Sequence, residues 1–241
     1  MEDRCRIRME GAQEMQLRRA ILLYEGYQSS FATVHKVSQN NGVPVLDVGE
    51  AMSLASLASI AMSLGTSAHI GKFLRPEILS VGMNSVVWWI KPDFRRVWFN
   101  CSNNKTIGVE SAETPHPGLV MAVVSDRWYV FAVKGDTRPE ADTLLYQAPY
   151  FNVWTNGLIC TGSTQVPEDV SASNIASWET AFFSSAFSHP NVHAPDKLLK
   201  YRGGEYKFWR HMLDGRFKDF PEKVLVASDL TVEGFIQEVC K

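Results

Sequence analysis

Between residues 86 and 147 the chain alternates short apolar runs with short polar links. Val86–Ile90 and Val97–Asn100 are rich in aromatic and β-branched residues. Leu119–Val124 and Trp128–Val133 form a second pair of runs, and their link is only three residues long. Short runs of this composition, joined by short links, are typical of neighbouring antiparallel strands. Together with Leu144–Gln147 they predict an antiparallel meander of four or five strands.

The chain after residue 170 has a helical pattern. Apolar residues at helical spacing predict a helix that begins at Ser171 or Ser173, which are suitable N-caps, and runs to about Phe187. Pro190 ends this segment, because proline disfavours the helical conformation of the residue before it. Further helical segments are expected at 197–201, 205–213 and 231–239. Strands followed by helices indicate an α+β architecture.

Residues 1–75 are expected to form an extension in front of a core at residues 76–241. The first 16 residues read as a weakly ordered polar leader. Ala20–Tyr24 and Phe31–Val37 are short apolar runs that predict the two strands of a β-hairpin.

A third strand and a helix are expected to complete this extension. Val43–Val48 follows the turn signal Asn40-Asn41-Gly42 and predicts the strand. Apolar residues recur at helical spacing over Glu50–Leu64, and Gly65 is a suitable helix stop.

The composition excludes several classes of protein. The chain has 241 residues, of which 45% are hydrophobic and 21% charged, with a formal net charge of -2, as in ordinary globular proteins. Binding of nucleic acid or of an anionic membrane surface requires a clustered excess of basic residues, which the sequence lacks. The most apolar segment, Ala51–Leu64, is too short to cross a bilayer.

The cysteines favour a reducing compartment. The four cysteines lie at positions 5, 101, 160 and 240, and no two of them form a C-x-x-C pair. This spacing argues against a zinc site or a dense disulfide framework. The start of the chain has no secretory signal. We therefore expect a cytoplasmic protein that binds no metal and no cofactor of its own.

The segment from Asn152 to Cys160 has the residues for acyl transfer. Cys160 follows a glycine turn at Gly157 and a short apolar run, and Asn152 lies eight residues upstream of it. A thiol can carry an acyl group if a donor stabilises the oxyanion that forms when the group is attacked. A fixed side-chain amide such as that of Asn152 is a suitable donor.

This segment resembles the active-site signature of ubiquitin-conjugating enzymes. In that family an asparagine precedes the thioester-forming cysteine by eight residues, and the loop follows a four-stranded meander and precedes helices. Two features differ, because Tyr150-Phe151 replaces the His-Pro of the family and no Trp-Ser-Pro follows Cys160. These features resemble a prokaryotic branch, the protein B family of ParB-related, ThiF-related cassettes (PRTRC). This likeness includes Leu74–Leu79 and Val87–Pro92.

The resemblance implies an activity and partners. It implies a ubiquitin-conjugating-like (UBC-like) fold in which Cys160 carries a ubiquitin-like protein as a thioester and passes it to an amine. It also implies a ThiF-like activating enzyme as partner, which consumes the ATP, together with the ubiquitin-like protein and other cassette proteins.

Each of these residues also has a simpler interpretation. A free cysteine such as Cys160 is most often a small buried hydrophobic residue. Asn152 can brace the loop by bonding nearby backbone, and Gly157 can supply a backbone conformation that other residues avoid. Glu168 and Asp169 lie near the thiol in sequence and are candidates for orienting an incoming lysine.

Two further functions remain open. The replacement of His-Pro by Tyr150-Phe151 is compatible with a non-catalytic UBC-like scaffold that binds a ubiquitin-like or cassette partner. His189 and His193 are candidates for the histidine of a Cys-His hydrolase, if folding brings one of them to Cys160.

Overall fold

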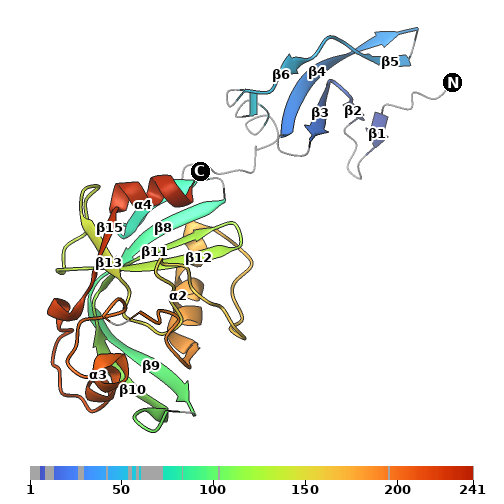
Figure 1. Cartoon of the computed structure of the whole chain (residues 1–241). Coiled ribbons are helices and arrows are strands. Elements are labelled where there is room, and N and C mark those ends of the chain that lie inside the picture. Colours follow the sequence, from blue (N-terminus) through green and yellow to red (C-terminus); the bar gives the residue numbers. More distant parts are fainter. Residues whose placement is uncertain are drawn as a thin grey trace. The chain divides into compact units, whose positions relative to one another are not determined.

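The computed structural model describes residues 6–8, 14–26, 30–41, 43–53, 56–57, 60, 73–82, 84–102, 104–194 and 196–240. The chain divides into two compact units, Met1–Phe73 and Leu74–Lys241 (Figure 1).

The described part of the first unit is mainly strand. Its elements are β1 (Arg6–Arg8), β2 (Glu14–Gln16), β3 (Arg19–Glu25), β4 (Ser30–Asn40), β5 (Val43–Leu46) and β6 (Glu50–Ala51). β3 and β4 form the predicted antiparallel hairpin, and β5 and β6 both pair with β4. The predicted strands over 20–24, 31–37 and 43–48 are therefore present.

Two expectations for this unit need correction. The polar leader contains the antiparallel pair β1–β2, in which Ile7 lies opposite Met15. The helix predicted from Glu50 starts instead as strand β6, because Glu50 and Ala51 pair with Val34 and Thr33 of β4. Farther along the range, residues 56, 57 and 60 are helical, as predicted, and most of the others up to Leu64 lie outside the described residues.

The second unit is built on a six-stranded antiparallel sheet. Its strands are β7 (Ile78–Gly82), β8 (Ser85–Ile90), β11 (Gly118–Val124), β12 (Arg127–Val133), β13 (Leu144–Gln147) and β15 (Ala227–Thr231). Their order in the sheet is β15-β13-β12-β11-β8-β7. The apolar runs at 86–90, 119–124, 128–133 and 144–147 thus became strands, as predicted.

The prediction of a single meander needs correction, because the second unit also contains a three-stranded sheet. It contains β9 (Asp93–Cys101), β10 (Gly108–His116) and β14 (Ala186–Phe187), in the order β10-β9-β14. β9 follows β8 directly in sequence but pairs with β10, and β8 pairs with β11. Pro92 lies in the short link between β8 and β9 and cannot donate a ladder hydrogen bond. The chain therefore leaves the first sheet at this link.

The helices of the second unit all follow β13, in agreement with the predicted α+β architecture, although β14 and β15 lie between them. They are the 3₁₀ turn η1 (Ala172–Asn174), α2 (Ile175–Ser184), α3 (Gly204–Leu213), the 3₁₀ turn η2 (Glu222–Val224) and α4 (Val232–Val239). α3 and α4 correspond to the helical segments expected at 205–213 and 231–239.

One predicted helix ends earlier than expected, and one predicted helical segment is absent. The helix expected to reach Phe187 ends at Ser184, because Ser185 is extended and Ala186–Phe187 pairs in parallel with β9. Residues 197–201 form no helix, because Leu198 and Leu199 are buried and the backbone N–H of Lys200 bonds the carbonyl of Val224 at 2.7 Å. Tertiary contacts replace local helical bonds there.

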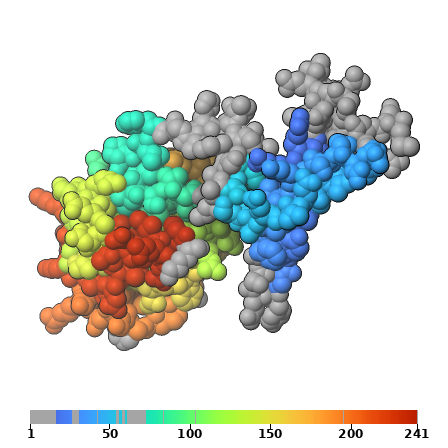
Figure 2. All heavy atoms as spheres, turned by 90° about the horizontal axis from the view of Figure 1, so that it is seen from above, coloured from blue at the N-terminus to red at the C-terminus, as the bar shows by residue number. Residues whose placement is uncertain are grey.

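The six-stranded sheet has an apolar core on each face. On one face, Trp88 and Met121 pack with residues of β9, α2 and α3, such as Phe99 and Phe182. The other face, with Val120 and Phe131, is covered by α4. Figures 1 and 2 show α4 in red on the surface of this unit. The chain between β13 and α2 contains the Cys160 segment.

Candidate active site

Residues 152–160 form a tight hairpin. Val153 and Ile159 are paired as an antiparallel bridge, and the N–H of Cys160 donates to the carbonyl of Asn152 at 2.7 Å. The turn is closed by bonds from the N–H of Gly157 to the carbonyl of Trp154 and from Trp154 to Leu158, both at 2.9 Å. The eight-residue spacing therefore places Asn152 directly opposite Cys160.

The hairpin is fixed to strand β12. The N–H of Val130 donates to the carbonyl of Gly157, and the N–H of Ile159 donates to the carbonyl of Trp128, both at 2.8 Å. Leu158 also forms an antiparallel bridge with Tyr129. The segment that leads to Cys160 is thus attached to the central sheet by ladder-type bonds, which hold a functional group more firmly than a free loop does.

Gly157 is required by both its backbone and its surroundings. Its φ is +78°, in the left-handed region that side chains disfavour. A Cβ built at this position would lie 2.3 Å from Cε2 of Phe131. Only glycine lets the turn approach β12 this closely.

Cys160 differs from the other described cysteines in its surroundings. It is exposed at the end of the hairpin. Cys101 is buried, its Sγ lies 3.5 Å from the carbonyl oxygen of Phe187, and burial raises the pKa of its thiol to about 11. Cys240 is exposed in the residue after α4. A thiol that exchanges acyl groups between proteins must be accessible, and Cys160 meets this requirement.

The side chain of Asn152 contacts the end of helix α2. Its Nδ2 donates to Oγ of Ser185 at 3.5 Å, and the Ser185 hydroxyl in turn donates to the carbonyl of Phe182 at 2.6 Å. Its Oδ1 is buried and has no hydrogen-bond partner in the structure. The long bond to Ser185 holds the amide only weakly, and its carbonyl side is unsatisfied.

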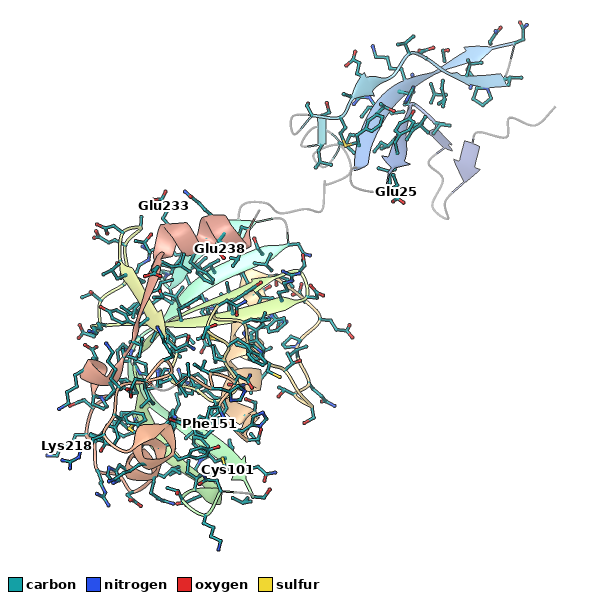
Figure 3. All side chains as sticks on the ribbon, viewed as in Figure 1. Glu25, Cys101, Phe151, Lys218, Glu233 and Glu238 are labelled. Carbon is teal, nitrogen blue, oxygen red and sulfur yellow. The ribbon has the colours of Figure 1, made fainter. Side chains whose placement is uncertain are left out.

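Tyr150 and Phe151 anchor the hairpin in the core. Both side chains are fully buried. Tyr150 contacts the rings of Phe182 and Trp209, and Trp209 Nε1 donates to the carbonyl of Pro149 at 2.8 Å. Figure 3 labels Phe151, which packs edge-to-face on Phe99 at 5.4 Å between ring centroids. Two buried aromatic side chains thus occupy the positions at which ubiquitin-conjugating enzymes have His-Pro. Burial also raises the pKa of the Tyr150 phenol.

The two candidate histidines share a pocket of their own. His189 and His193 are exposed and line a pocket together with Glu205 and Tyr206. Cys160 does not line this pocket. His189 is bonded locally, with Nδ1 at 3.0 Å from Oγ of Ser188.

Glu168 and Asp169 line a second groove. The groove runs between residues 163–169 and helix α2, and Ser185 is also part of its wall. Asp169 accepts a hydrogen bond from Ser171 at 2.6 Å. The groove therefore begins three residues after Cys160 and contacts the serine that binds Asn152.

Sequence reasoning did not identify Ser185 or Asn191 as part of this site. The N–H of Asn191 donates to the carbonyl of Phe151 at 2.8 Å, and Nδ2 of Asn191 is buried without a partner. Both residues lie more than 20 positions after Cys160. The string His189-Pro190-Asn191 was a signal in this region, but it predicted only the end of a helix and not a contact with the hairpin.

Two further observations concern the described part of the chain. It contains no helix that is long and apolar enough to span a bilayer. No group of three or more His, Cys, Asp or Glu side chains among these residues is arranged to hold a metal ion.

Comparison with known proteins identifies the family. Residues 53–228 match the family model of prokaryotic E2 family D, a ubiquitin-conjugating-like family. Neither the curated proteins nor the solved structures contain a match. The match covers most of the chain, including the sheet, the Cys160 hairpin and helices α2 and α3, and the chain therefore belongs to prokaryotic E2 family D.

Proposed function

We propose that the protein carries a ubiquitin-like protein as a thioester on Cys160 and transfers it to an amine. The Cys160 thiolate attacks the thioester carbonyl carbon of the ubiquitin-like protein on its activating enzyme, whose cysteine leaves as a thiolate. An amine then attacks the Cys160 thioester. A C–N bond forms, the C–S bond breaks, the amine loses a proton and Cys160 leaves as a thiolate.

The exposure of Cys160 at the end of a hairpin attached to β12 is the observation that carries this proposal. Membership of prokaryotic E2 family D supports the same chemistry. The buried Cys101 is unsuited to it, because burial disfavours its thiolate.

The partners follow from the likeness to the PRTRC protein B family. We propose a ThiF-like activating enzyme that consumes ATP and a ubiquitin-like protein as the cargo. Other cassette proteins are further candidate partners.

The direct test mixes the protein with the activating enzyme, ATP and the ubiquitin-like protein. We expect an adduct on a non-reducing gel that dithiothreitol removes. In Cys160→Ser the adduct should be absent or should resist dithiothreitol, because an oxyester replaces the thioester. Cys240→Ser is the matched control, since it removes the other exposed thiol of the described residues and should leave the adduct unchanged.

An unchanged thiol-sensitive adduct in Cys160→Ser would contradict the assignment. So would an adduct that disappears in Cys240→Ser but persists in Cys160→Ser.

A non-catalytic scaffold is the second candidate, and the fully buried Tyr150 and Phe151 in place of the His-Pro pair are the observation that favours it. The adduct test above discriminates it from the thioester carrier, since a scaffold forms no adduct on Cys160.

Asn152 is a candidate oxyanion donor or loop brace, and its role is tested separately. The amide donates to Ser185, which is the geometry of a loop brace. Asn152→Ala and Ser185→Ala separate the two roles. A donor predicts that only Asn152→Ala slows transfer, by about tenfold to a thousandfold. A brace predicts similar losses of stability in both variants and equal, small changes in transfer.

A Cys-His hydrolase is a weaker alternative. His189 and His193 line a pocket that does not include Cys160, so the geometry gives this activity less support. Replacing both histidines should leave thioester formation intact.

A further inference from the structure

Strand β3 has one unpaired edge. Within the described strands, β3 lies at the end of its sheet and pairs only with β4. Its sequence, Arg-Ala-Ile-Leu-Leu-Tyr-Glu, has no charge and no proline between its two terminal residues. Natural edge strands usually carry such residues, because an open row of backbone N–H and C=O groups recruits another strand.

The described residues of the first unit bury little apolar surface. None of the residues before Ile78 whose side-chain exposure the structure describes is buried. On β3, Leu23 is 73% exposed and Ile21 is 43% exposed, and Phe31 on the neighbouring β4 is 60% exposed. A small sheet of this kind needs more packing than it has in the single chain.

The charges of β3 match those of a second β3 that runs in the opposite direction. With Leu22 at the centre, Arg19 of one copy lies opposite Glu25 of the other, and the reverse pair forms at the other end. Figure 3 labels Glu25, which lies at the end of β3. Neither side chain has an ion pair within the described part of its own chain, and the cross-strand neighbour of Arg19 on β4 is Lys36, a like charge.

We propose that β3 pairs antiparallel with β3 of a second copy and joins the two N-terminal sheets into one continuous sheet. The interface is isologous, as in most homodimers, so each favourable contact occurs twice. In this register Ile21 lies opposite Leu23 of the other copy, and the two most exposed apolar groups of the strand cover one another. The inference uses no residue of the Cys160 site and is independent of the proposed function.

The test measures the mass of the full chain by sedimentation velocity over a range of concentrations. We expect a concentration-dependent dimer for the natural sequence. Arg19→Glu and Glu25→Arg each place like charges opposite one another at both ends of the interface. Each should weaken the dimer by about tenfold to a hundredfold.

The double variant Arg19→Glu/Glu25→Arg is the decisive arm, because it restores opposite charges across the interface and should restore the dimer. Glu50→Arg is the matched control: it makes the same charge change as Glu25→Arg on an exposed residue of β6 and should leave the dimer unchanged. Far-UV circular dichroism checks that each variant is folded.

Three results would overturn the proposal. One is a natural chain that stays monomeric at all concentrations. Another is a dimer that neither single charge reversal weakens, because the dimer contact would then lie outside β3. The third is a double variant that remains as weak as the singles. If a charge reversal unfolds the first unit, the proposal is tested by hydrogen exchange of the β3 amides in the natural chain. Their protection from exchange must rise with protein concentration if β3 is the dimer contact.

Discussion

Gly157 and Phe131 are the residues on which the approach of the Cys160 hairpin to β12 depends. The turn at Gly157 requires a positive φ, and the ring of Phe131 occupies the place where a side chain would begin. The position of Cys160 therefore depends on the absence of a side chain three residues earlier.

We expect Gly157→Ala to lower the free energy of unfolding of the core by about 2–5 kcal/mol, the sum of a left-handed backbone penalty and overpacking against Phe131. Denaturant unfolding followed by tryptophan fluorescence measures it. Gly162→Ala is the matched control, because Gly162 has φ +51° but open space around it. It should lose only about 1–2 kcal/mol. Equal losses in the two variants would show that the contact with Phe131 has no energetic effect.

At this scale the sequence predicted the spacing of the site and missed its surroundings. Asn152, Gly157 and Cys160 could be chosen because they lie in one short segment whose residue types suit acyl transfer. Ser185 could not, since its contact with Asn152 depends on where helix α2 ends. That end is set by the pairing of Ala186–Phe187 with β9, which is a long-range contact.

At the scale of elements, strands with aromatic and β-branched runs could be predicted, and polar strands could not. β10 reads Gly-Val-Glu-Ser-Ala-Glu-Thr-Pro-His and has no apolar alternation. It is a strand because it pairs along its whole length with β9. The sequence also could not show that β8 pairs with β11 rather than with β9, because local patterns do not distinguish these two possible partners.

The contact between β10 and α2 contains a buried histidine. His116 is 1% exposed, and its ring lies 5.3 Å from that of Phe183 in α2. Its Nδ1 lies 2.7 Å from the carbonyl of Pro117, to which it donates, and Nε2 has no partner. The pKa of His116 is lowered to about 4, mainly by burial and also by the nearby Arg95, while the hydrogen bond to the Pro117 carbonyl and the charge of Asp93 act in the opposite direction.

This histidine predicts a loss of stability in acid. Because the folded-state pKa lies below the ordinary 6.5, the unfolded chain binds more protons between these values. The stabilisation is complete above about pH 6.5 and is lost as the pH falls toward about 4, by about 3 kcal/mol in total. The free energy of unfolding, measured by urea at several pH values, should fall more steeply in the natural chain than in His116→Gln.

Glu179 changes the pH dependence of stability in the opposite direction, and it is present both in the natural chain and in His116→Gln. Burial raises the pKa of this carboxyl group, which bonds Trp88, so protonation in acid favours the folded state. The difference between the two pH profiles, rather than either profile alone, therefore isolates His116. Parallel profiles would mean that protonated His116 is tolerated in the folded core.

At the scale of the whole molecule, the two units differ in how they are stabilised. Every buried apolar side chain in the described part of the chain belongs to Leu74–Lys241, which has a core on both faces of its sheet. The first unit has paired strands but no buried side chain among its described residues. The sequence predicted strands in both units, but it could not show this difference, because exposure depends on what covers each face.

We therefore expect the fragment 74–241 to fold without the first unit. Its free energy of unfolding should equal that of the core in the full chain within about 1 kcal/mol, since the buried apolar side chains of the described residues all belong to this fragment. Chemical denaturation followed by tryptophan fluorescence measures this, because most of the aromatic core lies in this unit. The fragment should also be monomeric at concentrations where the full chain dimerises, since it lacks β3.

A fragment that loses cooperative unfolding would show that the first unit completes the core, and one that still dimerises would place the dimer contact outside β3. If the fragment folds and accepts the ubiquitin-like protein on Cys160, the two roles separate. The second unit would then carry the thioester, and the first would set the number of such sites held together. Pairing through β3 would bring two Cys160 sites into one particle without changing the contacts around either thiol.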